Sequence, residues 1–392
     1  MMRQRWWWLA VAALFVVVVA APVSAEDDKA SDWAEKLVSG EDADVRIEAG
    51  IKLGWKDPDA LALALDKVIK AKREGDAALL ATIAVRTRVI HVRYLLTWAA
   101  SRLEGAGAAF RQKIDNDHPL ETMRALECLG LLRDKDSSEA MLIQLRNDDE
   151  LVAIQAAKSL AMLGDKKMVN PMVEQALGID SKQVRVHLVW AIQDILKSRK
   201  GAMGTFSKFR KKKGTAGFRA KEAYGILEDE LAEPNEYKVK LDVIRKLFAR
   251  RGGTKSPPVS GKSEQEERFR KIIETMKKDT PDYWHLVSVS LNEITVSGNE
   301  QMFDFAAKKM NFRFRDLSGW GDREELYAYY LVRYATIIFT GGHMGEAQEK
   351  QLGWEKGVME GYWYAMEYTK IAVDEDPMKF FLSIINQRPP PW

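Results

Sequence analysis

The feature that most constrains the fold is an apolar stripe with helical spacing that recurs along the chain. Its clearest copy lies in residues 151–165, LVAIQAAKSLAMLGD, and has the members Val152, Ala156, Ser159, Leu160 and Leu163. Intervals of three and four residues are typical of one face of an amphipathic helix, and small residues in the stripe let a neighbouring helix approach closely. Gly164 is placed to end this helix in the left-handed conformation. A second helix is predicted over residues 168–177 after a short turn.

Comparable stripes begin near residues 45, 92, 118 and 184, and a weaker one begins near residue 216. The well-formed starts at 118, 152 and 184 are 34 and 32 residues apart. Self-similarity at a nearly fixed period is the pattern of a helical solenoid, in which each helix pair buries its apolar face only by stacking on its neighbours. We therefore expect an α-solenoid rather than a bundle around one centre.

Three of these stretches resemble the HEAT-repeat family in its short form. They are DVRIEAGIKLG at 44–54, VAIQAAKSLAMLGD at 152–165 and VRVHLVWAIQDIL at 184–196. They follow a scheme of Val-Arg, Ala, Ala/Ser-Leu and Leu-Gly-Asp, although Val152 is followed by alanine and only one copy ends in Leu-Gly-Asp. The resemblance covers about residues 40–230. It implies a curved stack of antiparallel helix pairs with a protein-binding or scaffolding surface, and it implies no chemistry. Tetratricopeptide repeats have a similar period and are the second interpretation.

An arginine follows valine in several of these units, at Arg46, Arg93 and Arg185. Such a series could form a ladder that binds a ligand. The stronger expectation is that each arginine pairs with an acid or with a helix C-terminus of the neighbouring repeat.

A break in the pattern divides the chain. Residues 251–263, RGGTKSPPVSGKS, are rich in Gly, Pro, Ser and Lys and have no apolar period, so a flexible linker or loop is predicted over 251–265. The solenoid is expected over 26–250 and an aromatic-rich helical C-terminal region over 266–392, which either continues the repeats or folds separately. Within that region, residues 281–310 are predicted to form one more helix pair. The predicted fold class is all-α, a solenoid of HEAT-like antiparallel helix pairs followed by this region.

The first residues have the pattern of a secretory signal peptide. Arg3 and Arg5 precede an apolar run of 16 residues from Trp6 to Ala21, and Val23-Ser24-Ala25 has the small residues of a cleavage site. The alternative is an uncleaved anchor, but a spanning helix needs about 20 apolar residues. We therefore expect cleavage after Ala25, with residues 1–25 removed, and a periplasmic or secreted mature chain.

The one cysteine bears on how an exported chain is stabilised. Cys128 stands alone, so no intramolecular disulfide is possible and stability must come from packing. Cys128 itself falls on the apolar face of a predicted helix and is expected to be buried as a small hydrophobe.

A basic segment at residues 197–221 is the first candidate binding site, because it holds ten lysines and arginines and no acid. Such a cluster attracts polyanions. For an exported chain, acidic polysaccharide, cell-wall polymer or a membrane surface is a more plausible partner than nucleic acid, which is not expected. The residues proposed to bind an anionic partner are Lys208, Arg210, Lys211, Lys212 and Lys213. The alternative is a solvated loop between two helices.

The aromatic C-terminal region is the second candidate. A ligand groove could be formed by Trp320, Trp354, Tyr362 and Trp363. A glycosidase would also need two convergent carboxylates, and candidates are Asp316, Asp322, Glu324 and Glu325, but no spacing selects a pair of them. Aromatics at helical spacing, such as Tyr327, Tyr330 and Tyr334, are expected to pack in the core.

No motif assigns a reaction. None of the five histidines stands three or four residues from another, and no set with metal-ligand spacing is present in the sequence. We therefore predict no catalytic residue, no metal and no cofactor, while leaving enzymatic activity open. The predicted function is a non-enzymatic protein-binding or scaffolding protein of the cell envelope or exterior. The alternative is a carbohydrate-active or anionic-glycan-binding protein that uses the C-terminal aromatics and the basic segment.

Overall fold

The computed structural model describes residues 25–114, 118–228, 241–251, 256–261, 263–296, 303–304, 307–312 and 324–340. The predicted signal peptide, apart from Ala25, lies outside these residues, as do Trp320, Trp354, Tyr362 and Trp363 of the predicted groove. The described residues are mostly helical, as predicted. No helix among them is long and apolar enough to cross a membrane.

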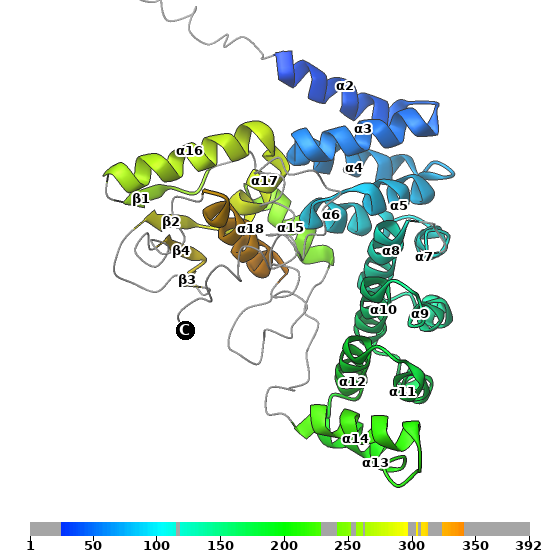
Figure 1. Cartoon of the computed structure of the whole chain (residues 1–392). Helices are drawn as coiled ribbons and strands as arrows, with labels where there is room; N and C mark the ends of the chain where they lie inside the picture. The colour runs from blue at the N-terminus through cyan, green and yellow to red at the C-terminus, as the bar shows by residue number, and fades with distance from the viewer. Residues whose placement is uncertain are drawn as a thin grey trace, which may run out of the picture.

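The first part of the chain is a stack of helices, each of which packs mainly on helices one or two places away in the chain order. In chain order they are α2 Ala25–Ser39, α3 Ala43–Lys56, α4 Pro58–Ala71, α5 Asp76–Arg86, α6 Ile90–Ala100, α7 Ala106–Arg111, α8 Pro119–Leu132, α9 Ser138–Gln144, α10 Glu150–Leu163, α11 Val169–Gly178, α12 Lys182–Leu196, α13 Arg199–Ser207 and α14 Thr215–Glu228. Single 3-10 turns at Lys135–Ser137 and Lys166–Met168 precede α9 and α11. Helices α8, α10 and α12 form one row, and α7, α9 and α11 form a second row beside it (Figure 1).

The helices arise from the stripes seen in the sequence. All five members of the stripe in α10 are buried, and Gly164 takes the left-handed conformation, with φ 69°, at its C-cap. The second helix predicted over 168–177 is α11. N-terminal caps mark the starts of the row helices: the Asp149 carboxylate accepts from the amides of Leu151 and Val152, and the Ser181 hydroxyl accepts from the amide of Val184.

The second part of the chain has helices α15 Leu241–Arg251, α16 Ser263–Asp279, α17 Pro281–Ser290 and α18 Glu324–Thr340. It also has a small sheet that was not predicted from the sequence. Strands β1 Val259–Gly261, β2 Glu293–Val296, β3 Phe303–Asp304 and β4 Lys309–Phe312 lie in the order β1-β2-β4-β3. The β1–β2 and β2–β4 pairs are parallel and the β3–β4 pair is antiparallel.

Two predictions need correction here. The helix pair predicted over 281–310 is wrong in its second half, because α17 ends at Ser290 and strands follow. Ile294 and Val296 are buried and alternate with half-buried Glu293 and Thr295, which is the period of a strand. Strand β1 lies within residues 251–265, the stretch predicted as a flexible linker, and pairs with β2.

The chain turns back after α14, so that the second part packs on the early helices of the stack. Helix α15 contacts α4 and α6, and α17 contacts α3 (Figure 1). Ion pairs cross this junction, including Arg245–Asp66 at 2.6 Å and Arg88–Asp282 at 3.2 Å. The pair α13–α14 lies at the opposite end of the stack, away from α15–α18 (Figure 1).

Candidate functional site

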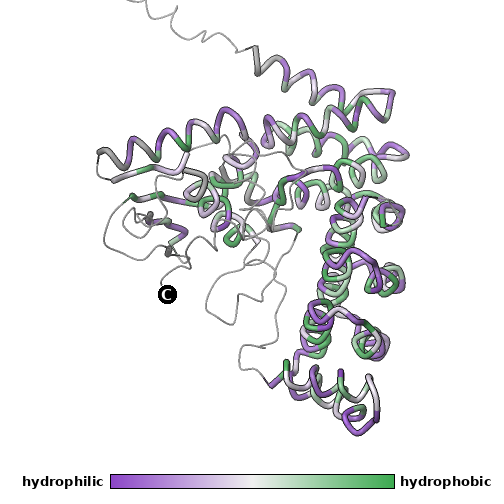
Figure 2. Tube along the Cα trace, in the orientation of Figure 1, coloured by the Kyte–Doolittle hydropathy of each residue, from purple (hydrophilic) through white to green (hydrophobic). Residues whose placement is uncertain are grey.

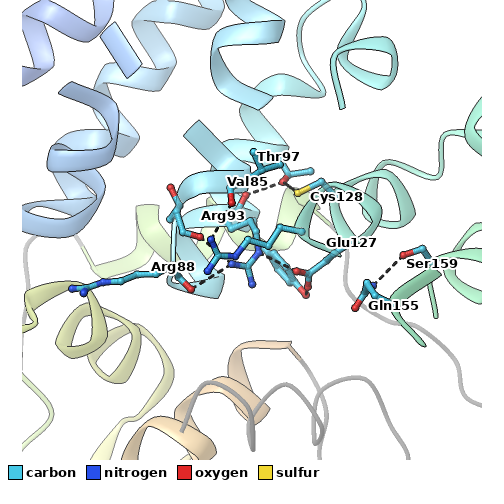
Figure 3. Close-up of polar contacts among 11 residues, drawn as sticks. Val85, Arg88, Arg93, Thr97, Glu127, Cys128, Gln155 and Ser159 are labelled. Carbon is cyan, nitrogen blue, oxygen red and sulfur yellow. Dashed lines mark hydrogen bonds and ion pairs between the residues drawn. The ribbon is translucent and has the colours of Figure 1, made fainter. Parts of the chain in front are cut away.

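The arginines that follow valine are held by buried or half-buried partners. Arg93 lies 2.9 Å from the Glu127 carboxylate, which also accepts from the Tyr94 hydroxyl at 2.6 Å (Figure 3). A second nitrogen of Arg93 donates to the carbonyl oxygen of Thr87, the C-cap of α5. These side chains are almost wholly buried. Arg93 therefore joins α6 to α8 and to the end of α5.

The other two arginines of the series make the same kind of contact. Arg46 donates to Asp76 at 2.7 Å and to the carbonyl oxygen of Leu37. Arg185 lies 3.0 Å from Glu222 and donates to the carbonyl oxygen of Ile179, the C-cap of α11. The expectation that these arginines pair with an acid or a helix end is confirmed, so they hold the stack together.

Further polar contacts continue along the row. The Thr97 hydroxyl donates to the Sγ atom of Cys128 at 3.1 Å, and the Gln155 amide donates to Ser159 at 3.0 Å (Figure 3). Cys128 is fully buried, as predicted. On α12, burial lowers the pKa of His187 to about 3, with a further contribution from the nearby Lys158 ammonium. These polar contacts thus lie in or next to the interior of the stack.

A pair of buried histidines occupies the junction between the two parts of the chain, and sequence reasoning missed it. The rings of His91 on α6 and His285 on α17 stack with centroids 5.2 Å apart, and Phe248 and Phe339 each lie 5.8 Å from His91. His285 Nε2 lies 3.1 Å from the Asp59 carboxylate. Within the described residues, neither ring nitrogen of His91 has a hydrogen-bond partner. Burial holds the pKa of His91 well below its ordinary value, and His285 and Arg93 lower it further.

An apolar edge, which we define as Leu120, Ile143 and Leu151, lies at helix ends of the stack. Leu120 and Leu151 are each the second residue of a row helix, α8 and α10, and Ile143 is the second-last residue of α9. Ile143 is 70% exposed and Leu151 is 53% exposed. Next to Ile143 is a hollow of about 460 Å³. The other side chains that line this hollow are Leu142, Gln144, Arg146, Asn147 and Gln175.

The basic turn, which we define as residues 208–213, connects α13 to α14 at the end of the stack (Figure 1). Hydrophilic residues dominate it (Figure 2). The structure thus brings together all five predicted anion-binding residues, and each is exposed: Lys208, Arg210, Lys211, Lys212 and Lys213. None of them makes an ion pair with an acid in the described part of the chain. By contrast Arg219, in the same basic segment, pairs with Asp180.

Contacts within the basic turn and with α14 fix its shape. The Arg210 guanidinium lies 3.9 Å from the centre of the Tyr224 ring, and the Lys212 ammonium lies 4.6 Å from that of Phe209. Gly214 turns the chain into α14 with φ 80°. Gly217 lies so close to the turn that a Cβ atom there would be 1.8 Å from the carbonyl oxygen of Lys212. The turn can therefore hold this position only with glycine at 217.

Alanine at two glycines of α14 is expected to act with opposite signs. Gly217→Ala must displace the basic turn and should lower the melting temperature and raise amide exchange in α13 and α14. Gly225→Ala meets no atom within 4 Å, so it should stabilise the helix by about 0.5–1 kcal/mol, because glycine is the poorer helix former. Thermal unfolding with hydrogen exchange by mass spectrometry measures both. Equal effects of the two variants would contradict the close approach at Gly217.

The remaining predicted site cannot be placed. Trp320, Trp354, Tyr362 and Trp363 lie outside the described residues, so the aromatic groove stays a prediction. Tyr327 and Tyr330 are buried, as predicted for core residues. Among the residues that the structure describes, no group of three or more His, Cys, Asp or Glu side chains could hold a metal ion.

No protein-family model matches the chain, and no curated protein matches it.

Proposed function

We propose that the chain is an exported, non-enzymatic scaffold of HEAT-like repeats that binds a partner protein at the apolar edge. The observation that carries this proposal is the exposure of Ile143 and Leu151 on either side of the α9–α10 turn. Single exposed leucines are common, but two exposed apolar residues that flank one short turn, one of which lines a hollow, are typical of a surface that a partner covers. The repeat period and the signal-like N-terminus support the solenoid and the export.

The surroundings of the apolar edge suit a protein partner. The hollow beside Ile143 has polar walls in which Arg146 donates to Gln175 at 2.6 Å and Asn147 donates to Gln144 at 2.8 Å. An apolar centre with a polar rim is the usual composition of a protein interface. A partner would therefore pack an apolar side chain against Ile143 and make hydrogen bonds to the polar side chains of the hollow.

Site-specific photo-cross-linking in cells that express the full chain tests this proposal. A photoreactive residue at Ile143 is expected to capture one or a few proteins reproducibly, and mass spectrometry identifies them. The matched control is the same residue at Leu63 on α4, which is 64% exposed but lies outside the apolar edge. Leu151→Asp should remove the product formed at Ile143 while leaving the circular dichroism unchanged, because Leu151 is exposed.

The proposal fails if positions 143 and 63 capture the same proteins, because the edge would then have no preference over another exposed apolar residue. It also fails if Leu151→Asp leaves the Ile143 product unchanged in a folded chain. In either case the apolar edge is an ordinary part of the surface.

A further inference from the structure

The basic turn joins a cluster of exposed cations to an exposed aromatic ring at the end of the stack. Phe218, in the first turn of α14, is 63% exposed, and its amide donates to the carbonyl oxygen of Gly214, which follows Lys213 directly. Gly217, its neighbour, touches the backbone of Lys212. The ring and the cations therefore belong to one small surface, held in place by the contacts of Arg210 and Lys212 described above.

Within the described residues, no acid forms an ion pair with the cations of this surface. The arginines inside the stack, Arg46, Arg93 and Arg185, are each paired with a buried or half-buried acid. The lysines and arginine of the basic turn make no such pair within the described residues, and all are exposed. A cluster of this kind is attracted most strongly to a surface that carries many negative charges.

We propose that the basic turn and Phe218 bind the surface of a membrane that contains anionic phospholipid. The turn projects from the last helix pair of the stack (Figure 1), so a flat surface can reach it. Basic residues beside an exposed phenylalanine are the composition of interfacial membrane-binding segments, in which the ring enters the headgroup region and the cations attract the lipid phosphates. An exposed phenyl ring favours a lipid surface over a soluble sugar polymer, because the bilayer offers an apolar layer in which the ring can be buried. This inference is independent of the protein-binding proposal.

Vesicle sedimentation tests the inference with the mature chain from residue 26, so that the apolar run of the signal segment does not contribute. Vesicles of phosphatidylcholine with 30% phosphatidylserine are compared with vesicles of phosphatidylcholine alone. Binding is expected only to the anionic vesicles, and it should weaken with salt because the attraction is screened. A triple variant replaces three lysines of the turn with glutamine: Lys211, Lys212 and Lys213. It should weaken binding on the order of 100-fold, since each cation near an anionic surface raises the affinity about fivefold.

Two further variants separate the alternatives. A control variant replaces three exposed lysines elsewhere in the stack with glutamine: Lys135, Lys166 and Lys167. It changes the net charge by the same amount and should leave binding nearly unchanged. Phe218→Ser should weaken vesicle binding about tenfold or more, because the phenyl ring would no longer be buried in the membrane. It should not change binding to dextran sulfate, a soluble polyanion. The inference is overturned if the chain ignores anionic vesicles, if it binds dextran sulfate alone, if Phe218→Ser has no effect on vesicle binding, or if the two triple variants behave alike.

Discussion

Glu127→Ala is expected to lower the free energy of unfolding by about 3–5 kcal/mol, the range for breaking a buried ion pair from one side. The carboxylate of Glu127 is 3% exposed and contacts both the Arg93 guanidinium and the Tyr94 hydroxyl. Alanine removes the carboxylate but leaves the Arg93 charge in the interior, where it is costly without this partner. Urea unfolding followed by circular dichroism measures the loss, and hydrogen exchange should locate it in α6 and α8.

A matched substitution separates burial from charge. Glu48 forms an exposed pair with Lys52 on α3 at 2.6 Å, and Glu48→Ala should change stability little, because exposed pairs contribute little. Glu127→Gln keeps the shape and can still accept from Tyr94, so its effect should fall between the two. Equal stability of the Glu127→Ala and Glu48→Ala variants would show that the contact between α6 and α8 does not depend on this carboxylate.

The helices of the stack could be predicted because their signal is local. The stripe of α10 repeats within a few residues, and a glycine marks its end, so periodicity alone finds the helix. The sequence indicates that Arg93 pairs with an acid or a helix end, but it does not identify the acid. Its partner Glu127 stands inside the apolar stretch ALECLG of α8, and only the stacking of α6 on α8 shows that this acid is buried.

The small sheet could not be found in the same way. Its strands have two to four residues each, which is too short for alternation to be distinguished from one turn of a helix. Parallel pairing joins β1 to β2 across the whole of α16 and α17, and such contacts leave no periodic pattern. The β-branched residues Ile294, Thr295 and Val296 were the one available sign.

The candidate sites also differ in how much of each is visible in the sequence. The basic turn is contiguous in the sequence, so its charges are visible there, whereas its exposure and the position of Phe218 come from the structure. The apolar edge depends on exposure alone. His91 and His285 meet only because α17 packs on the early helices of the stack, and each looks solitary in the sequence. Their burial together has a consequence for stability that depends on pH.

Below about pH 6.5, stability is expected to fall more steeply in the parent chain than in a His91→Phe variant. The folded chain keeps His91 neutral, since burial holds its pKa well below the ordinary value, whereas the unfolded chain takes up a proton near pH 6.5. The unfolded state then binds more protons, so stability is greatest above pH 6.5 and falls as the pH falls. Each such histidine contributes a slope of about 1.4 kcal/mol per pH unit. His187 adds a similar slope down to about pH 3.

Urea unfolding between pH 7.5 and 5.5 measures this slope above the range in which carboxylates usually titrate. The His91 ring lies against the rings of Phe248 and Phe339, and no described hydrogen bond of this ring would be lost in a phenylalanine variant. His91→Phe is therefore expected to fold and to reduce the slope by about one histidine's share. His118→Gln changes an exposed histidine and should keep the parent slope. If both variants show the same slope as the parent, His91 is protonated in the folded state without disrupting the junction, and the prediction is wrong. If His91→Phe alone flattens the slope, burial of this ring between α6 and α17 makes the junction sensitive to acid.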